Sequence, residues 1–426
     1  MTVSSSWDVI VVGAGPAGLM AALRAAECGR RTLLLEKNSR PGVKILMSGG
    51  TRCNVTHDTD ERGIVAAYGR QGPFLHSALA ALGPSDLLQL LAAEGVTTKV
   101  EDSGKVFPVS DKAADVLAAL LNRLRQSGAE LALSQPLLTL QRADADFRLQ
   151  TPDRILQTPQ VVLTTGGRSY PGCGTTGDGY AWAAELGHTI IPPKPALTPV
   201  TTDLEWIRSL RGVTIPDVLV QVVVAGQVQL SSGHRGRSNK PGALAQARGS
   251  FLFTHFGLSG PPILDVSRVI SRHANPRELQ LVCDFFPDES AERLQRWLDV
   301  QCAADGKRRL AGILGDRLPR RLVEGAFAVA GLPLERRAAE TSRQDRQRAV
   351  ENLKRLTIPV SGVMGFRKAE VTAGGVSLDE VDSRNMQSKL VPGLYFAGEL
   401  LDLDGPIGGY NFQAAFSTGW LAGQSV

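Results

Sequence analysis

Residues 8–36, DVIVVGAGPAGLMAALRAAECGRRTLLLE, decide the fold of this 426-residue chain. The apolar run at residues 8–12 predicts a buried parallel strand, and a glycine-rich turn and a helical stretch at 19–28 follow it. A second apolar strand, residues 32–35, ends at Glu36. Strand, glycine turn, helix, strand and spaced acid form a complete dinucleotide-binding unit, which is far more specific than its glycines alone.

Each part of this unit has a predicted task. Gly13 permits the tight turn, Gly15 lets the backbone approach a pyrophosphate, and Gly18 lets the helix pack closely on the sheet. The start of the helix offers unpaired N–H groups and a positive dipole end to the phosphates. Glu36 is expected to accept hydrogen bonds from ribose hydroxyls.

Composition is that of an ordinary globular protein, with 43% hydrophobic and 21% charged residues. The five cysteines are widely spread and show no metal-ligand spacing, so we expect a reduced, cytoplasmic protein without a metal site. The first strand begins too early to leave room for a signal peptide. We also expect no membrane span, because no apolar run approaches the roughly 20 residues that one needs.

Positive charge gathers between residues 307 and 355, where 13 Lys and Arg stand against 6 Asp and Glu. The first interpretation is a solvated helical surface, and the alternative is a docking face for an anionic partner or nucleic acid. No aromatic interleaving or RNA-binding motif supports the alternative. Nucleic acid is therefore not an expected partner.

The chain predicts an insertion between two halves of one nucleotide-binding domain. A proline-rich segment at 192–195 marks the first boundary. Beyond it the pattern predicts strands at 218–224, 227–230, 250–254 and 279–284, with a polar, basic loop at 231–248. Amphipathic helices are expected over 288–355. The predicted domains are 1–193 with 371–426 (nucleotide-binding), 194–286 with 356–370 (β-rich and barrel-like), and 287–355 (helical).

The C-terminal segment identifies the dinucleotide. A short strand at 394–397 ends in Gly398 and Glu399, which places a carboxylate within reach of cofactor hydroxyls. The glycine-rich run at 405–409 then opens an apolar helix. The start of such a helix can stabilise the negative charge that develops on a reduced flavin, and a dehydrogenase that binds only nicotinamide needs no such segment. We therefore expect non-covalent FAD.

Four separated motifs carry a family resemblance. They are ILMSGGTRCN (45–54), VFPVSDKA (106–113), THFGLSGP (254–261) and YFAGE with GGYN (395–399 and 408–411). With these motifs in order, nearly the whole chain resembles the BaiN/RdsA family of bacterial NAD(P)/FAD-dependent oxidoreductases. The resemblance implies an α/β fold, in which a discontinuous Rossmann-type FAD-binding domain carries inserted β-barrel-like and helical domains. It also implies NAD(P)H-driven reduction of an enone for some members.

The resemblance also implies cofactor contacts. The residues carried over are Ala14, Gly15, Ala17 and Gly18 at the pyrophosphate, Glu36 and Lys37 at the ribose, Ser48, Gly49, Arg52 and Asn54 along the flavin, Leu137 at the adenine, and Glu399, Gly408, Gly409 and Asn411. Gly13, Gly166 and Gly398, each in a turn that follows a predicted strand, complete the predicted site. The chain departs from the family at Thr51, where a third glycine is usual, and at Gln387, where Glu is common.

Three side chains are candidates for a catalytic role. His255, expected at the end of a strand in the inserted part, could give a proton to substrate or simply hold its turn. Tyr410 lies near the predicted flavin edge. Cys53 invites a redox role, but no second cysteine stands beside it, so packing is the first interpretation.

Three function classes remain open. The first is a reductase that uses NAD(P)H, with hydride transfer at flavin N5 to a small, partly apolar, enone-like substrate. The chain has a single dinucleotide fingerprint, so a nicotinamide donor is expected to enter the shared cavity. The second class is a flavin oxidase of an amine that uses oxygen. The third is a flavin-bearing protein that modifies or binds RNA. No pattern in the sequence predicts an oligomeric state.

Overall fold

The computed structural model describes residues 7–226 and 242–426. The predicted strand at 227–230 and the first part of the predicted basic loop, up to residue 241, lie outside the described residues. The chain divides into two compact units, Met1–Lys194 with Glu370–Val426 and, inserted between these pieces, Pro195–Ala369. The division of the insert into a β-rich and a helical domain stays a prediction.

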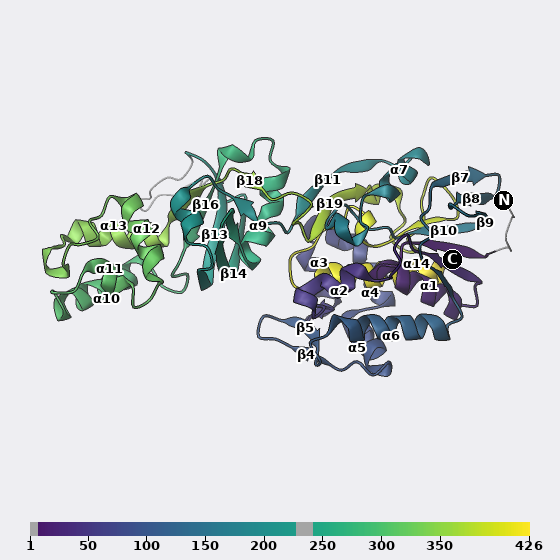
Figure 1. The fold of residues 1–426 in the computed structure, drawn as a ribbon, viewed down its shortest axis with the longest axis horizontal. Helices are drawn as coiled ribbons and strands as arrows, with labels where there is room; N and C mark the ends of the chain where they lie inside the picture. The colour runs from purple at the N-terminus through teal and green to yellow at the C-terminus, as the bar shows by residue number, and fades with distance from the viewer. Residues whose placement is uncertain (1–6, 227–241) are drawn as a thin grey trace. The chain divides into compact units, whose positions relative to one another are not determined.

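The first unit is built on a five-stranded sheet in the order β20-β10-β1-β2-β6, and every pair is parallel. Strand β10 of this sheet is labelled in Figure 1. The strands are β1 (Val9–Val12), β2 (Thr32–Leu35), β6 (Glu130–Ala132), β10 (Gln160–Leu163) and β20 (Leu394–Phe396). All four residues of β1 are buried, as expected for a central parallel strand. Parallel strands place their carboxyl ends at one edge, where ligands bind in such sheets.

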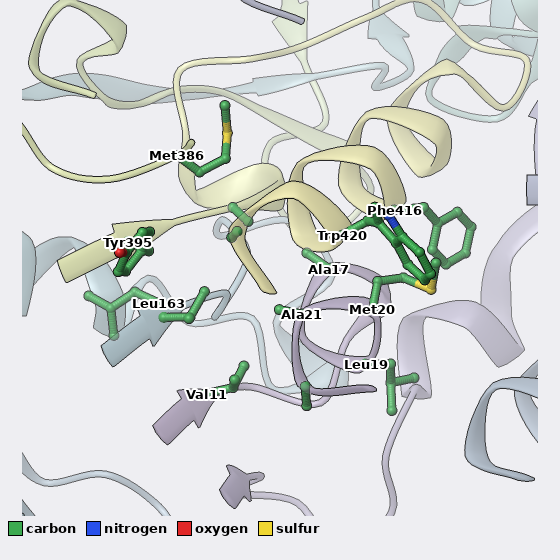
Figure 2. Close-up of a cluster of buried hydrophobic side chains, with 14 of the residues drawn as sticks. Val11, Ala17, Leu19, Met20, Ala21, Leu163, Met386, Tyr395, Phe416 and Trp420 are labelled. Carbon is green, nitrogen blue, oxygen red and sulfur yellow. The ribbon is translucent and has the colours of Figure 1, made fainter. Parts of the chain in front are cut away.

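The two ends of the chain pack together beside this sheet. Helix α1 (Pro16–Glu27) lies against α14 (Tyr410–Ser425), and Figure 2 shows Ala17 and Ala21 close to α14. A Cβ atom on Gly419 would lie 2.2 Å from the carbonyl oxygen of Ala17, and one on Gly423 equally close to that of Ala21. The helices therefore approach backbone to backbone, and this contact brings the C-terminal segment to the N-terminal turn.

The remaining elements of the first unit surround this core. They are α2 (Val43–Met47), β3 (Thr56–His57), α3 (Glu61–Ala67), α4 (His76–Ala81), α5 (Pro84–Ala93), β4 (Thr98–Val100), β5 (Lys105–Pro108), α6 (Ala113–Gln126), β7 (Thr139–Ala143), β8 (Asp146–Gln150), β9 (Ile155–Thr158), α7 (Asp178–Glu185), β11 (Ile190–Ala196) and β19 (Val371–Val376). Strands β7, β8 and β9 form an antiparallel meander.

The second unit contains a seven-stranded sheet in the order β17-β16-β13-β14-β15-β12-β18. Its elements are β12 (Val200–Thr201), α8 (Glu205–Ser209), β13 (Thr214–Val224), β14 (Ala245–Thr254), β15 (Gly257–Ser259), α9 (Pro261–Arg272), β16 (Leu279–Asp284), α10 (Ala291–Ala304), α11 (Leu310–Leu314), α12 (Arg320–Ala330), α13 (Arg343–Lys354), β17 (Leu356–Pro359) and β18 (Gly362–Val363). Sheet and helices share a hydrophobic core that is separate from that of the first unit. Among the described residues, no helix has the length and apolar character to cross a membrane.

Candidate functional site

The glycines of the N-terminal turn serve two different purposes. A Cβ on Gly13, which has φ of 101°, would lie 2.9 Å from the carbonyl oxygen of Thr164. A Cβ on Gly18 would lie 1.8 Å from the carbonyl oxygen of Gly13, so helix and turn are in direct backbone contact. Around Gly15, by contrast, no described atom lies within 4 Å of such a Cβ. Gly13 and Gly18 are needed by the fold, whereas Gly15 opens onto space that a ligand can use.

Glu36 is fixed beside this turn. Its side chain is 7% exposed, and its two carboxylate oxygens accept hydrogen bonds from the backbone N–H groups of Ala14 (2.7 Å) and Asn38 (2.8 Å). Each carboxylate oxygen keeps a further lone pair for a hydroxyl donor. The adjacent Lys37 donates to Asp178 (2.6 Å), at the start of α7. Leu137 lies in the segment of chain that connects β6 to β7, and it is buried.

The loop that follows α2 has an unusual backbone. Gly49, Gly50, Thr51 and Cys53 all have φ between 55° and 71°. The Arg52 guanidinium lies 4.0 Å from the centre of the Phe107 ring and pairs with Glu101 at 2.6 Å. The buried side-chain oxygen Oδ1 of Asn54 has no partner among the described residues. The Arg52 side chain is thus engaged by the protein, while Asn54 has hydrogen-bonding capacity left for a ligand.

Thr51 is expected to be under backbone strain, because a β-branched residue at positive φ is an outlier. We predict that Thr51→Gly raises the free energy of unfolding by about 0.5–1 kcal/mol, after the entropic cost of glycine is counted. Urea denaturation of the full chain measures this. Thr98→Gly, in strand β4, is the matched control and should destabilise; a loss of stability in Thr51→Gly would contradict the prediction.

Cys53 is fully buried, and burial raises the pKa of its thiol to about 12, against a hydrogen bond to Ser48 that lowers it. A neutral, enclosed thiol is a poor nucleophile, which favours the packing role. We predict that iodoacetamide at about pH 8 labels the exposed Cys28 of the native protein and leaves Cys53 unlabelled until urea is added. Peptide mass spectrometry reads both sites, and rapid native labelling of Cys53 would refute the packing role.

The C-terminal glycine run is held by contacts that the sequence did not reveal. His57, at the end of β3, hydrogen-bonds through Nδ1 to the carbonyl oxygen of Gly408 (3.0 Å), and its ring stacks on Tyr410 at 4.6 Å. A Cβ on Gly409 would lie 2.3 Å from the carbonyl oxygen of Thr56, so the run lies directly on β3. The strand therefore fixes the position of the first turn of α14.

Asn411 serves the same loop. Its Oδ1 accepts from the backbone N–H of Gly405 (2.9 Å), and its Nδ2 donates to the carbonyl oxygens of Gly405 (3.0 Å) and Pro406 (3.2 Å). The Tyr68 hydroxyl donates to the carbonyl oxygen of Tyr410 (3.1 Å). The side chain of Asn411 thus stabilises the loop at Gly405 and Pro406. Its expected contact with the cofactor stays a prediction.

Glu399 lies where the chain returns to the sheet. It follows β20, and its Oε1 accepts from the backbone N–H of Thr372 (2.8 Å), while its Oε2 pairs with Lys44. A Cβ on Gly398 would lie 2.8 Å from the Cβ of Ala17 in the first turn of α1. Gly166, with φ of 73°, ends the turn after β10 at the same edge of the sheet.

These positions bring most of the predicted cofactor residues to one edge of the first unit. The segments that supply them lie near the two ends of the chain, and the paired parallel strands β1, β10 and β20 bring these segments together.

His255 belongs to the other compact unit, where it is exposed at the turn between β14 and β15. Its carbonyl oxygen accepts a hydrogen bond from Arg208 (3.0 Å). Sequence reasoning missed Lys44 and His57, because no local pattern distinguishes either residue.

Residues 7–425 match the model of the family described as HI0933-like protein Rossmann domain. A ribosomal RNA dihydrouridine synthase of Escherichia coli is 33% identical over 424 residues, which cover 99% of this chain and 98% of the relative. A 3-dehydro-bile acid delta(4,6)-reductase of Clostridium scindens is 29% identical over 423 residues, or 98% of each protein.

Among solved structures, a 3-ketosteroid-delta4-(5alpha)-dehydrogenase of Rhodococcus jostii matches with a TM-score of 0.50 at 16% identity. The match covers 100% of this chain and 97% of that one. At this identity the likeness concerns the fold alone. Because the family model spans almost the entire chain, the protein belongs to the HI0933-like family and has the Rossmann-type FAD-binding fold of FAD-dependent oxidoreductases.

Proposed function

We propose that this protein uses FAD to reduce a carbon–carbon double bond that is conjugated to a carbonyl group. The names of two full-length relatives support this proposal, because dihydrouridine and a reduced delta(4,6) bile acid both arise by adding two hydrogens across such a ring double bond. NAD(P)H is the proposed electron donor.

FAD fits the residues at the edge of the sheet. The open space at Gly15 and the first turn of α1 suit a diphosphate, and the fixed carboxylate of Glu36 suits ribose hydroxyls. The unpartnered Oδ1 of Asn54 and the start of α14 behind Gly409 suit the flavin part. The other cofactor contacts expected from the sequence belong to this same proposal.

The bound flavin would supply the hydride, and the protein would stabilise charge on the reduced ring, orient the substrate and move a proton. The first turn of α14 would stabilise negative charge on the reduced ring, and the contacts of His57 and Asn411 hold that turn in place before the cofactor arrives. Tyr410, whose ring stacks on His57, stays a candidate to orient substrate or move a proton.

Uracil in ribosomal RNA is the favoured substrate class within this proposal. Two relatives with that activity in their names, from Escherichia coli and Haemophilus influenzae, are 33% and 32% identical and cover 99% and 98% of this chain. This preference departs from our sequence-based expectation that nucleic acid is no partner. A steroid-like enone is the competing class.

The test uses the full chain loaded with FAD under anaerobic conditions. NADH and NADPH are added separately, and bleaching of the flavin absorbance reports reduction. The reduced protein is then mixed with ribosomal RNA transcribed in vitro, or with a 3-keto-4-ene steroid. We expect nucleoside mass spectrometry to find uridine that has gained two hydrogens, and flavin reoxidation that depends on RNA. Reoxidation by neither substrate would refute the proposal, and reoxidation by the steroid alone would refute the RNA preference.

A further inference from the structure

We propose that Lys44 is a positioning residue, which holds the carboxylate of Glu399 in place for the hydroxyls of the FAD ribityl chain. The proposal rests on the FAD site proposed above. It adds a residue that no sequence pattern singles out, because Lys44 and Glu399 stand 355 positions apart in the chain.

Both residues flank the N-terminal glycine turn. Lys44 belongs to α2, and Gly42, immediately before that helix, donates its backbone N–H to the carbonyl oxygen of Ala14 (2.8 Å). Glu399 follows Gly398, which packs against Ala17. The ammonium and the carboxylate therefore meet beside the turn that faces the proposed diphosphate, in the region where the ribityl chain would continue from it.

Glu399 is held on two sides. The backbone N–H of Thr372 donates to Oε1 at 2.8 Å, and Lys44 pairs with Oε2. The side chains of Lys44 and Glu399 are only 20% and 16% exposed, so solvent screens the pair less than it screens a surface ion pair. Each carboxylate oxygen keeps one lone-pair direction for a further donor, as a ribityl hydroxyl requires.

Gly167 and Thr372 pack closely around the carboxylate of Glu399. A Cβ on Gly167 would lie 2.3 Å from Oγ1 of Thr372 and 2.8 Å from Oε1 of Glu399. That same Oγ1 accepts hydrogen bonds from the backbone N–H groups of Arg168 (2.8 Å) and Ser169 (3.1 Å). The turn after β10 and strand β19 are thereby tied together around the carboxylate. Lys44 contributes a partner for this carboxylate from the N-terminal half of the site.

Fixing a carboxylate before binding favours affinity, because the ligand then meets an acceptor that is already ordered. Without the ammonium, the Oε2 side of the Glu399 carboxylate loses its partner, and the side chain can rotate away from the cofactor. We expect Lys44→Met to weaken FAD binding by about tenfold, the scale of one lost hydrogen bond to a charged group. Lys44→Arg keeps the charge and should restore most of the affinity.

The experiment is a double-mutant cycle on the dissociation constant of FAD. Full-length apoprotein is titrated with FAD, and quenching of flavin fluorescence gives the Kd for wild type, Lys44→Met, Lys44→Arg, Glu399→Gln and the Lys44→Met/Glu399→Gln double variant. If Lys44 acts through Glu399, its replacement adds less than about threefold once Glu399 is changed. Equal losses in both backgrounds would mean that Lys44 contacts the cofactor directly, and this would overturn the proposal, as would an unchanged Kd in Lys44→Met.

Lys354→Met is the matched control. Lys354 pairs with Asp284 at 2.6 Å in the other compact unit, and these side chains are 13% and 18% exposed, close to the values for Lys44 and Glu399. The control should lower the melting temperature and leave the Kd of FAD unchanged. If it weakens FAD binding as much as Lys44→Met does, general destabilisation explains both results and the proposal fails. Wild-type protein that takes up no FAD would instead refute the FAD site itself.

Discussion

Gly15→Ala is expected to lower the affinity for FAD by about a hundredfold while the melting temperature of the apoprotein stays the same. Alanine fits the protein, because Gly15 has φ of −82° and ψ of −173°, and no described atom lies within 4 Å of the added Cβ. The methyl group would instead occupy the space through which the diphosphate approaches the backbone. Loss of a ligand without loss of stability is the signature of a residue that serves binding alone.

Titration with FAD and thermal unfolding of the same apoprotein samples test this expectation. Gly312→Ala is the control, since Gly312 also has nothing within 4 Å of its Cβ but lies on α11 in the other unit. That variant should leave FAD affinity unchanged, and any change in stability should be a gain, because alanine favours the helix. Unchanged FAD binding in Gly15→Ala would show that the diphosphate does not lie at this turn, and the proposed FAD site would have to be abandoned.

Gly18→Ala, three residues away, is expected to have the opposite effect. The added Cβ would stand 1.8 Å from the carbonyl oxygen of Gly13 and 2.5 Å from Oγ1 of Thr164. Neither neighbour can move freely, because the Thr164 hydroxyl donates to the carbonyl oxygens of Val12 and Gly13, both at 2.9 Å. Helix α1 would have to lift from the sheet, and we expect a loss of about 3 kcal/mol in the free energy of unfolding.

Urea denaturation of the apoprotein measures this loss without reference to FAD. Ala22→Gly, a buried position further along α1, is the comparison, because it perturbs the same helix without creating a clash. We expect that change to cost about 1 kcal/mol. A Gly18→Ala protein as stable as wild type would mean that helix α1 lies further from the turn than the 1.8 Å approach requires.

The nucleotide-binding unit could be predicted because its signals are local. The apolar strand, glycine turn, helix and second strand fit within 29 residues. Each glycine stands where a turn, a close approach to a ligand or close helix packing leaves no room for a side chain. The return of the C-terminal segment to the sheet was also predictable, since near the C-terminus an apolar strand is again followed by a glycine and an acid, Gly398 and Glu399.

Other features of the site depended on packing between distant segments. Sequence reasoning predicted a cofactor contact for Asn411, which stays a prediction, and did not reveal that its amide hydrogen-bonds to the backbone of Gly405. It placed Arg52 along the flavin, and the guanidinium is held over Phe107 by Glu101. Both side chains are polar and near the predicted site, so residue type alone could not predict which groups of the protein they contact.

By itself, then, the sequence determined the βαβ unit, the FAD-binding class of fold and the two chain segments that we propose for the site, because these follow from short-range patterns and from glycine backbone geometry. Only the tertiary structure decided which side chains meet there: Lys44 with Glu399, and His57 with Gly408 and Tyr410. The reason is physical. Such pairs depend on the order β20-β10-β1 and on the backbone contact between α1 and α14, and no periodicity in the chain encodes the partner across hundreds of residues.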